Sequence, residues 1–309
     1  MSSTDDQHIS PAQVSAWRRE LGLGADGRPP LPWLDVLEAS AVPVEAIRWL
    51  WPGWLAAGKL AILAGAPGTG KTTLALALAA TLSRGGDWPD GSPGSAPGDV
   101  LIWSGEDAPG DTLVPRLRAA GADLHRLRFV NGIIEGCHSR GFDPAADMPH
   151  LVAALERYPD LRLLIIDPIV SAVRGDSHKA AEVRRSLQPI ADFAMKQHCA
   201  VLGITHFSKG SGGGNPLERV IGSQAYGALA RVVLVAGKDE RHDGGRVLAR
   251  AKSNIGPDDG GVAYTLEQVQ LAPGIEASRV MWGERLEGSA REILGAVEGQ
   301  EEEPESQEF

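Results

Sequence analysis

The sequence has little cysteine, with Cys137 and Cys199 as the only two among 309 residues. Two thiols cannot form a disulfide framework, and their spacing matches no metal-binding pattern. Free thiols are typical of a reducing compartment. Residues 2–6 are polar and acidic, unlike the start of a secretory signal, and no run of about 18 apolar residues is present to cross a membrane. We therefore expect a cytoplasmic protein.

An excess of positive charge is missing as well. The net charge is −10, and residues 298–309 contain six glutamates but no lysine or arginine. Without that segment the charges are nearly balanced, and a broad basic surface for nucleic acid is not indicated. Any nucleic-acid contact must therefore come from local basic loops. We expect the acidic end to be a disordered tail.

Composition divides the chain into three parts. Residues 1–43 are polar and then rich in glycine and proline, which predicts a largely irregular N-terminal arm with one short helix near residues 11–21. Residues 44–286 contain no linker and form one predicted domain. Residues 287–309 are predicted to hold a short helix followed by the acidic tail.

Within residues 44–286, short apolar runs alternate with segments rich in helix-forming residues. Continuous apolar runs are typical of strands buried on both faces, and strands that alternate with helices form parallel sheets. The predicted fold class is α/β, with a mostly parallel twisted β-sheet flanked by helices. Strands are predicted near 60–64, 100–103, 127–130, 161–166, 200–205, 232–236, 246–251 and 262–266, and helices near 72–82, 109–120, 148–157, 180–197 and 223.

Three tryptophans, Trp49, Trp51 and Trp54, lie shortly before the first of these strands. Their spacing favours packing within the fold, and contact with an adenine base is the alternative. Two segments rich in glycine, proline and serine, residues 84–99 and 208–215, predict exposed loops.

A glycine-rich loop follows the first strand, and its sequence matches the pattern G-x-x-x-x-G-K-[ST]. Glycines let backbone N–H groups approach phosphate, and the following helix points its positive end at the same place. Lys71 supplies a positive charge to the β- and γ-phosphates, and the Thr72 hydroxyl is the expected Mg²⁺ ligand. We therefore expect ATP and Mg²⁺ to bind here, with nucleotide contacts from Gly65, Ala66, Pro67, Gly68, Thr69, Gly70, Lys71, Thr72 and Thr73.

Carboxylates end two further predicted strands. Asp167 follows the apolar residues 163–166, which is the form of a Walker B strand, and we expect it beside the phosphate loop in the Mg²⁺ shell. Many P-loop hydrolases have an Asp-Glu pair at this place, but here Asp167 is followed by Pro168. The carboxylate that activates water must therefore come from elsewhere. Glu106 is the candidate general base, with Asp107 next in line. The alternatives are a turn-capping role for Asp167 and a solvated turn for the other two.

His206 ends another predicted strand, at residues 200–205. At the carboxyl edge of a parallel sheet it can hydrogen-bond the γ-phosphate or the attacking water, so we predict a sensor of hydrolysis. A structural histidine is the alternative.

Taken together, these segments resemble the RecA/DnaB-like P-loop ATPases and, more narrowly, the RepA-type hexameric replicative helicases, AAA-type ATPases of plasmid and phage origin. The resemblance covers residues 31 to 286 and is carried by GAPGTGKTTLALALA, WSGEDAPGDTLVPRLRAAGA, LLIIDPIVSAVRGD, LGITHFSKG, VIGSQAYGALARVVLV and ARAKSNIGP. It implies a RecA-like core that assembles into a homo-oligomeric, hexameric ring with ATP between subunits. It also implies Lys71 and Thr72 at phosphate and Mg²⁺, Glu106 as catalytic carboxylate, Asp167 as the Walker B residue and His206 as sensor.

The resemblance further implies that a basic residue from the adjacent subunit completes each site and stabilises the transferring phosphoryl group. Lys252 and Arg219 are the favoured candidates, with Arg231 and Arg250 also open. Residues 174–185 and 208–219 would face the ring's channel. Both segments carry positive charge suited to a nucleic-acid backbone but contain no aromatic residue for base stacking, and ordinary surface loops are the alternative.

The sequence thus predicts an ATP-hydrolysing motor that acts on single-stranded nucleic acid, with single-stranded DNA as the expected partner, in DNA replication or recombination. Residues 1–43 are too short for the N-terminal helical or primase domain of full replicative helicases, so duplex unwinding is left open. One alternative is an ATP-dependent regulatory or assembly protein of the same fold, with a replication or phage protein as its partner. A small-molecule P-loop kinase is the third.

Overall fold

The computed structural model describes residues 10–20, 36–155, 157–177, 179–207, 217, 219 and 224–297, and the chain forms two units, Met1–Ala46 and Ile47–Phe309. In the first unit, helix α1 spans Pro11–Glu20, where a short helix was predicted, and a 3₁₀ turn spans Ala39–Ala41. The predicted acidic tail and the predicted loop at residues 208–215 lie outside the described residues. None of the described helices is both long and apolar enough to span a membrane.

The second unit is built on a nine-stranded sheet with the order β13-β12-β11-β10-β3-β9-β8-β4-β5. The strands from β5 to β10 in this order run parallel, and β11, β12 and β13 continue the sheet antiparallel. The predicted mostly parallel sheet is therefore present. Its strands are β3 (Leu60–Gly65), β4 (Asp99–Ser104), β5 (Leu127–Phe129), β8 (Leu161–Asp167), β9 (Ala200–His206), β10 (Val232–Lys238), β11 (Gly245–Ser253), β12 (Asp259–Ala272) and β13 (Ile275–Ser289).

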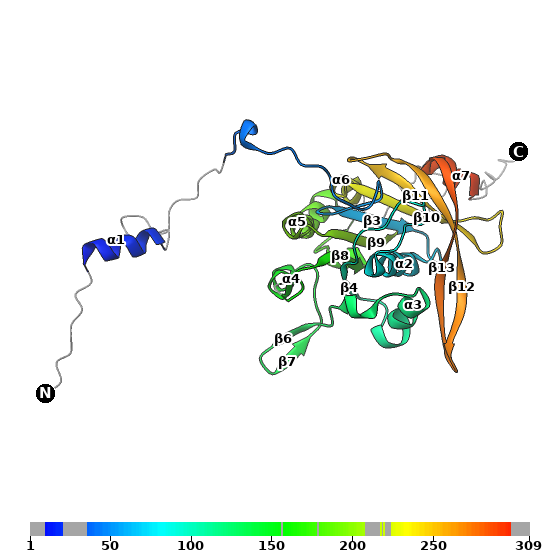
Figure 1. The fold of residues 1–309 in the computed structure, drawn as a ribbon, viewed down its shortest axis with the longest axis horizontal. Helices are drawn as coiled ribbons and strands as arrows, with labels where there is room; N and C mark the ends of the chain where they lie inside the picture. Colours follow the sequence, from blue (N-terminus) through cyan, green and yellow to red (C-terminus); the bar gives the residue numbers. More distant parts are fainter. Residues whose placement is uncertain are drawn as a thin grey trace, which may run out of the picture. The chain divides into compact units, whose positions relative to one another are not determined.

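Helices cover both faces of the sheet, as Figure 1 shows. One core layer packs α2 and α3 against the sheet together with Trp51, Trp54 and Trp88, and the other packs α4, α5, α6 and α7 against the opposite face. The helices are α2 (Lys71–Arg84), α3 (Val114–Ala119), α4 (Met148–Leu155), α5 (Ala180–Gln197), α6 (Gln224–Leu229) and α7 (Ala290–Val297), with a π-helical turn at Pro109–Leu113 leading into α3. The central strands are buried on both faces because their sequences are almost wholly apolar.

Trp51 and Trp54, which precede β3, belong to the core, whereas Trp49 is half-buried. Trp51 is fully buried, and its ring stacks on Trp54 and on Trp88 with centroid distances of 4.4 and 5.3 Å. Trp51 and Trp54 lie in the short strand pair β1 (Trp49–Trp51) and β2 (Leu55–Ala56) and the turn between them. Trp51 and Trp54 therefore pack within the fold, as their spacing predicts.

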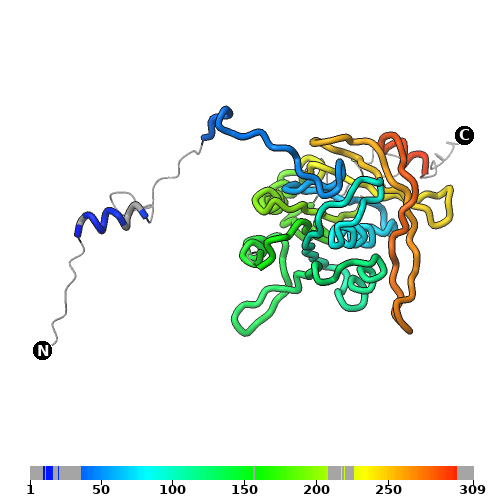
Figure 2. The backbone as a smooth tube through the Cα atoms, in the orientation of Figure 1, coloured from blue at the N-terminus to red at the C-terminus, as the bar shows by residue number. Residues whose placement is uncertain are grey.

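Two hairpins were not predicted from the sequence. The short one joins β6 (Ile133–Glu135) and β7 (His138–Arg140), and the long one joins β12 and β13. Only residues 262–266 of the long hairpin were predicted as strand. Figures 1 and 2 show that it runs along the edge of the molecule past α2 and α3. This hairpin adds a wall beside the loop between β3 and α2.

Candidate nucleotide-binding site

The loop between β3 and α2 is shaped by its own side chains. Gly68 and Gly70 have φ values of +78° and +83°, a region that favours glycine. Lys71 is buried, and its Nζ donates to the carbonyl oxygens of Gly65 and Ala66, each at 3.0 Å. The Thr69 hydroxyl also donates to Ala66 O, at 2.9 Å. The lysine thus lies inside the curve of the loop, where an arriving phosphate can replace the two carbonyls as its partner.

Strands from the far end of the chain support this loop, a contact that the sequence did not reveal. Tyr264 on β12 is buried, and its hydroxyl donates a 2.6 Å hydrogen bond to Thr69 O. Leu266 packs so closely that a Cβ on Gly70 would lie 2.7 Å from its Cδ1. Lys238, at the end of β10, has its Nζ 3.5 Å from the position of a Cβ on Gly68. The loop therefore lies between its own helix and the C-terminal strands.

Thr72 and Asp167 meet at the carboxyl edge of the sheet. The Thr72 hydroxyl donates to Asp167 Oδ2 at 2.7 Å. The strand that ends at Asp167, β8, is not the direct neighbour of β3, because β9 pairs with both and lies between them. The two side chains still meet, since Thr72 is on α2 and not on β3 itself.

Burial controls the electrostatics of Asp167. It raises the pKa of this carboxyl to about 6, and repulsion from Glu106 adds to the rise, whereas the hydrogen bond from Thr72 and the charge of Lys71 oppose it. Burial likewise lowers the pKa of Lys71, against the attraction of Asp167 and Glu106. A buried carboxylate and a hydroxyl that point at each other fit a Mg²⁺ ion, which takes few protein ligands and completes its shell with phosphate and water. No group of three or more His, Cys, Asp or Glu arranged for a metal occurs in the described part of the chain.

Glu106 and Asp107 follow β4, whose last residue, Ser104, lies opposite Asp167 in the sheet. The Ser104 hydroxyl accepts from the backbone N–H of Asp107 at 2.9 Å, and Asp107 forms an ion pair with Arg116 at 3.1 Å. The Glu106 side chain is exposed and makes no hydrogen bond or ion pair with any described residue. Of the two carboxylates, Glu106 is therefore the one free to contact a ligand.

His206 ends β9 and lies opposite Gly65 in the register of the sheet. Its Nδ1 is buried and has no hydrogen-bond partner among the described residues. Burial lowers the pKa of His206, and the charge of Lys71 lowers it further. A neutral ring with a buried nitrogen left unpaired, next to the phosphate loop, fits a site that receives a polar ligand.

The basic candidates do not gather at this site. Lys252 lies opposite Val233, well before the point where β10 passes Gly65, and its Nζ donates to the carbonyls of Gly227 and Ala230. Burial lowers the pKa of Lys252. Its position is therefore remote from the phosphate loop of its own chain.

The arginine candidates are packed against aromatic rings, with one exception. Arg219 is buried with its guanidinium 4.4 Å from the centroid of Phe207, the residue after His206. Arg250 lies over Trp54 at 4.6 Å, and Arg231 is exposed. Of the two predicted channel segments, residues 180–185 form the first turns of α5, and residues 208–216 lie outside the described residues.

Comparison with known proteins identifies the family of the chain and its fold. A family described as "AAA domain" matches residues 28–212. The DNA repair protein RadA of Streptococcus pneumoniae (strain ATCC BAA-255 / R6) is 23% identical over 265 residues, which cover 83% of this chain and 54% of that protein. RadA of Listeria monocytogenes serovar 1/2a (strain ATCC BAA-679 / EGD-e) is 24% identical over 256 residues, 80% of this chain and 48% of that protein. The chain thus spans about half the length of the curated relatives it matches.

Among solved structures, one described as an ATPase domain superposes with a TM-score of 0.53 at 14% identity, covering 84% of this chain and 96% of that one. At this level of identity the likeness concerns the fold alone. It confirms the prediction of a RecA-like P-loop core, with a mostly parallel sheet flanked by helices.

Proposed function

We propose that this protein hydrolyses ATP and acts on single-stranded nucleic acid. The premise is that the chain belongs to the AAA domain family and is a RecA/DnaB-like P-loop ATPase. The observation that carries this proposal is the convergence of Lys71, the Thr72–Asp167 pair and Glu106 at one edge of the sheet. A triphosphate-binding loop that faces a buried carboxylate and a free one contains the parts that phosphoryl transfer to water needs.

Each side chain has a separate role in the proposed reaction. Lys71 leaves the carbonyls of Gly65 and Ala66 and binds the β- and γ-phosphates. Thr72 and Asp167 would hold Mg²⁺, which would neutralise charge on those phosphates. Glu106 accepts the proton of the attacking water, for which an exposed carboxylate without a partner is suited. His206 Nδ1 senses the γ-phosphate or the water.

Lys252 is the better-placed candidate for completing a neighbouring subunit's site. Lys252 lies away from the phosphate loop of its own chain, so the only nucleotide that it can contact is one bound by an adjacent subunit. Such a role requires a ring, and a hexamer is the proposed assembly. Arg219 is less suited because it is buried against Phe207 of its own chain.

The nucleic-acid partner is proposed from local charge and from the relatives. Residues 174–185 expose four basic side chains, although the chain as a whole is acidic, and a ring would multiply this patch around its channel. The exposed basic residues are Arg174, Lys179, Arg184 and Arg185. The matched relatives are described as DNA repair proteins, which supports a role in DNA recombination or replication.

The deciding experiment measures ATP hydrolysis with and without single-stranded DNA at low salt, together with the mass of the assembly. Faster hydrolysis with DNA by an oligomer is expected. Unchanged turnover and no retention on DNA would reject the nucleic-acid role. In that case the alternative would be favoured, an ATP-dependent assembly protein with a protein partner, which also agrees with the net charge of −10. Absence of hydrolysis under every condition would reject the ATPase itself.

A further inference from the structure

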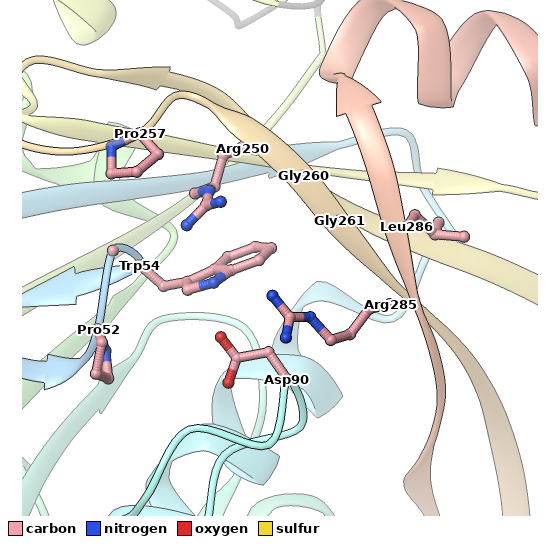
Figure 3. A pocket seen from close by; sticks show the side chains of 10 residues that line it. Pro52, Trp54, Asp90, Arg250, Pro257, Gly260, Gly261, Arg285 and Leu286 are labelled. Carbon is pink, nitrogen blue, oxygen red and sulfur yellow. The ribbon is translucent and has the colours of Figure 1, made fainter.

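A second cavity lies away from the nucleotide site. It has a volume of about 360 Å³ and is lined by residues of the β1–β2 turn, the loop after α2 and the outer strands β11, β12 and β13. Figure 3 shows Arg250 and Arg285 on either side of Trp54, with Asp90 facing Arg285. None of the residues that line the cavity belongs to the phosphate loop or its carboxylates, so the proposed ATPase reaction leaves this cavity without a role.

The guanidinium of Arg250 is fixed in place. It stacks over Trp54 at 4.6 Å, and its Nε donates to Asp259 O at 2.6 Å. Glycines on two separate segments leave the space that it occupies. A Cβ on Gly53 would lie 2.6 Å from Nη1, and a Cβ on Gly260 would lie 3.1 Å from Nη2. A long, flexible side chain is thus held in one position, which is how a binding site reduces the entropy lost when a ligand arrives.

The positive charge at this place is only partly compensated. The carboxylate of Asp259 lies 3.9 Å from Arg250 and is largely exposed, which makes it a weak partner. Burial lowers the pKa of Arg250, so its charged form lacks full solvation. Arg285 forms no hydrogen bond or ion pair with any described residue, but its charge attracts the carboxylate of Asp90, which faces it. Asp90 accepts from the backbone N–H and the hydroxyl of Ser92.

We propose that this cavity, the Arg250–Arg285 pocket, binds a small phosphate-bearing anion through the guanidinium groups of both arginines that line it. Guanidinium presents paired N–H donors that match the oxygens of a phosphate, and a second guanidinium that lines the same cavity adds further donors for the same ligand. The volume lies at the lower end of the range for small-molecule sites, about 300–1,000 Å³. Asp90 faces the same space and can accept a hydrogen bond from a hydroxyl or amino group elsewhere on the ligand.

The surroundings favour a small ligand over a nucleic-acid strand. The residues flanking the pocket include four exposed carboxylates, which repel an extended chain of phosphates more strongly than one compact anion, because a chain places more negative charges beside them. These are Asp258, Asp259, Glu284 and Glu287.

The test uses the full chain carrying Lys71→Ala, which removes the lysine contact to phosphate in the nucleotide site, and pyrophosphate as the probe in isothermal titration calorimetry. We expect one equivalent to bind. Adding Arg285→Gln should weaken the affinity at least about tenfold, and Arg250→Lys should do the same because an ammonium lacks the paired donors. The matched control is Arg279→Gln, on the same strand but paired with Glu267 at 2.7 Å, and it should leave the affinity unchanged.

No binding by the Lys71→Ala protein up to the millimolar range, or equal affinities of the Arg285→Gln and Arg279→Gln forms, would overturn the proposal. If Arg285→Gln instead reduced retention of a single-stranded oligonucleotide and pyrophosphate did not bind, the pocket would be a nucleic-acid contact and the proposal would also be wrong. Thermal unfolding of each variant checks that the fold is kept. Because no hydrolysis is measured, failure here does not bear on the ATPase proposal.

Discussion

Thr72 and Asp167 are 95 residues apart in the sequence, yet the Thr72 hydroxyl donates a 2.7 Å hydrogen bond to Asp167 Oδ2 across the carboxyl edge of the sheet. The fold itself therefore positions both proposed Mg²⁺ ligands. Burying the carboxylate opposes its ionisation, however, and raises its pKa from 3.8 to about 6. The site therefore holds a negative charge that the protein does not fully stabilise and that a cation would.

Replacing Asp167 by asparagine should stabilise the ligand-free protein at neutral pH. Because the folded state holds the proton of Asp167 more tightly than the unfolded state, wild-type stability is lost as pH rises from about 4 through 6, and asparagine has no such loss. The free energy of unfolding of Asp167→Asn should exceed that of wild type by up to about 3 kcal/mol at pH 7.5. The gap should close below about pH 4.

Urea unfolding at the two pH values, with a chelator present, measures this difference. Asp160→Asn, at an exposed aspartate, serves as control and should show no such dependence. If the difference in the free energy of unfolding stays constant or widens toward acid pH, the pKa of Asp167 is not raised in the folded protein.

Tyr264→Phe should weaken the support that β12 gives to the phosphate loop. The change removes the 2.6 Å hydrogen bond to Thr69 O, leaves a buried carbonyl short of a donor and should lower the free energy of unfolding by about 1–2 kcal/mol. Since Thr69 is part of the loop proposed to hold phosphate, KM for ATP should rise several-fold with a smaller change in kcat. Steady-state ATP hydrolysis and urea unfolding measure the two effects.

Tyr226→Phe is the matched control. Its hydroxyl is also buried but has no hydrogen-bond partner among the described residues, so its removal should leave stability the same or higher. Equal effects of the two substitutions would show that the bond to Thr69 contributes nothing.

The phosphate loop and the parallel strands were predictable because their signals are local. Residues 163–166 form an unbroken apolar run, and the loop needs glycines at fixed positions such as Gly68 and Gly70. The order of strands was not predictable in this way. That β9 separates β3 from β8 is decided by tertiary packing, which leaves no mark on any one segment.

The long hairpin escaped prediction for a different reason. Most of β13 is exposed or half-exposed, so its residues show no apolar run and no clean alternation. Tyr264 could be suspected only as an aromatic in a predicted strand, and its partner Thr69 lies 195 residues earlier. The hydrogen bonds of Lys252 to Gly227 and Ala230 likewise depend on how α6 packs against β11.

Glu106→Gln should leave ATP bound but largely unhydrolysed. Glutamine keeps the size of the side chain but cannot accept the proton of water, and loss of a general base costs about 10²–10⁴-fold in kcat. Binding of a fluorescent ATP analogue should be retained. Asp107→Asn is the control: this carboxylate is already paired with Arg116, so turnover should change much less. If Asp107→Asn gave the larger loss, the base would be Asp107.

Mixing two inactive variants tests whether Lys252 acts between subunits. Lys252→Ala chains keep an intact phosphate loop, and Lys71→Ala chains keep Lys252. An interface between a chain of the first kind and a chain of the second therefore contains a complete site only if Lys252 reaches across the interface. Random assembly from equal amounts makes about one quarter of the interfaces complete, and we expect about that share of wild-type turnover.

A mixture of Lys71→Ala with Glu106→Gln is the control for this experiment. Both residues are proposed to serve the nucleotide of their own chain, so no interface between these variants is complete and activity should stay absent. Recovery in this control would mean that subunits share those residues too. No recovery in the Lys252 mixture, although the variants are shown to co-assemble, would limit Lys252 to its present contacts with the carbonyls of Gly227 and Ala230 at the end of α6. The basic residue that completes the site would then have to be sought at Arg231, the exposed alternative.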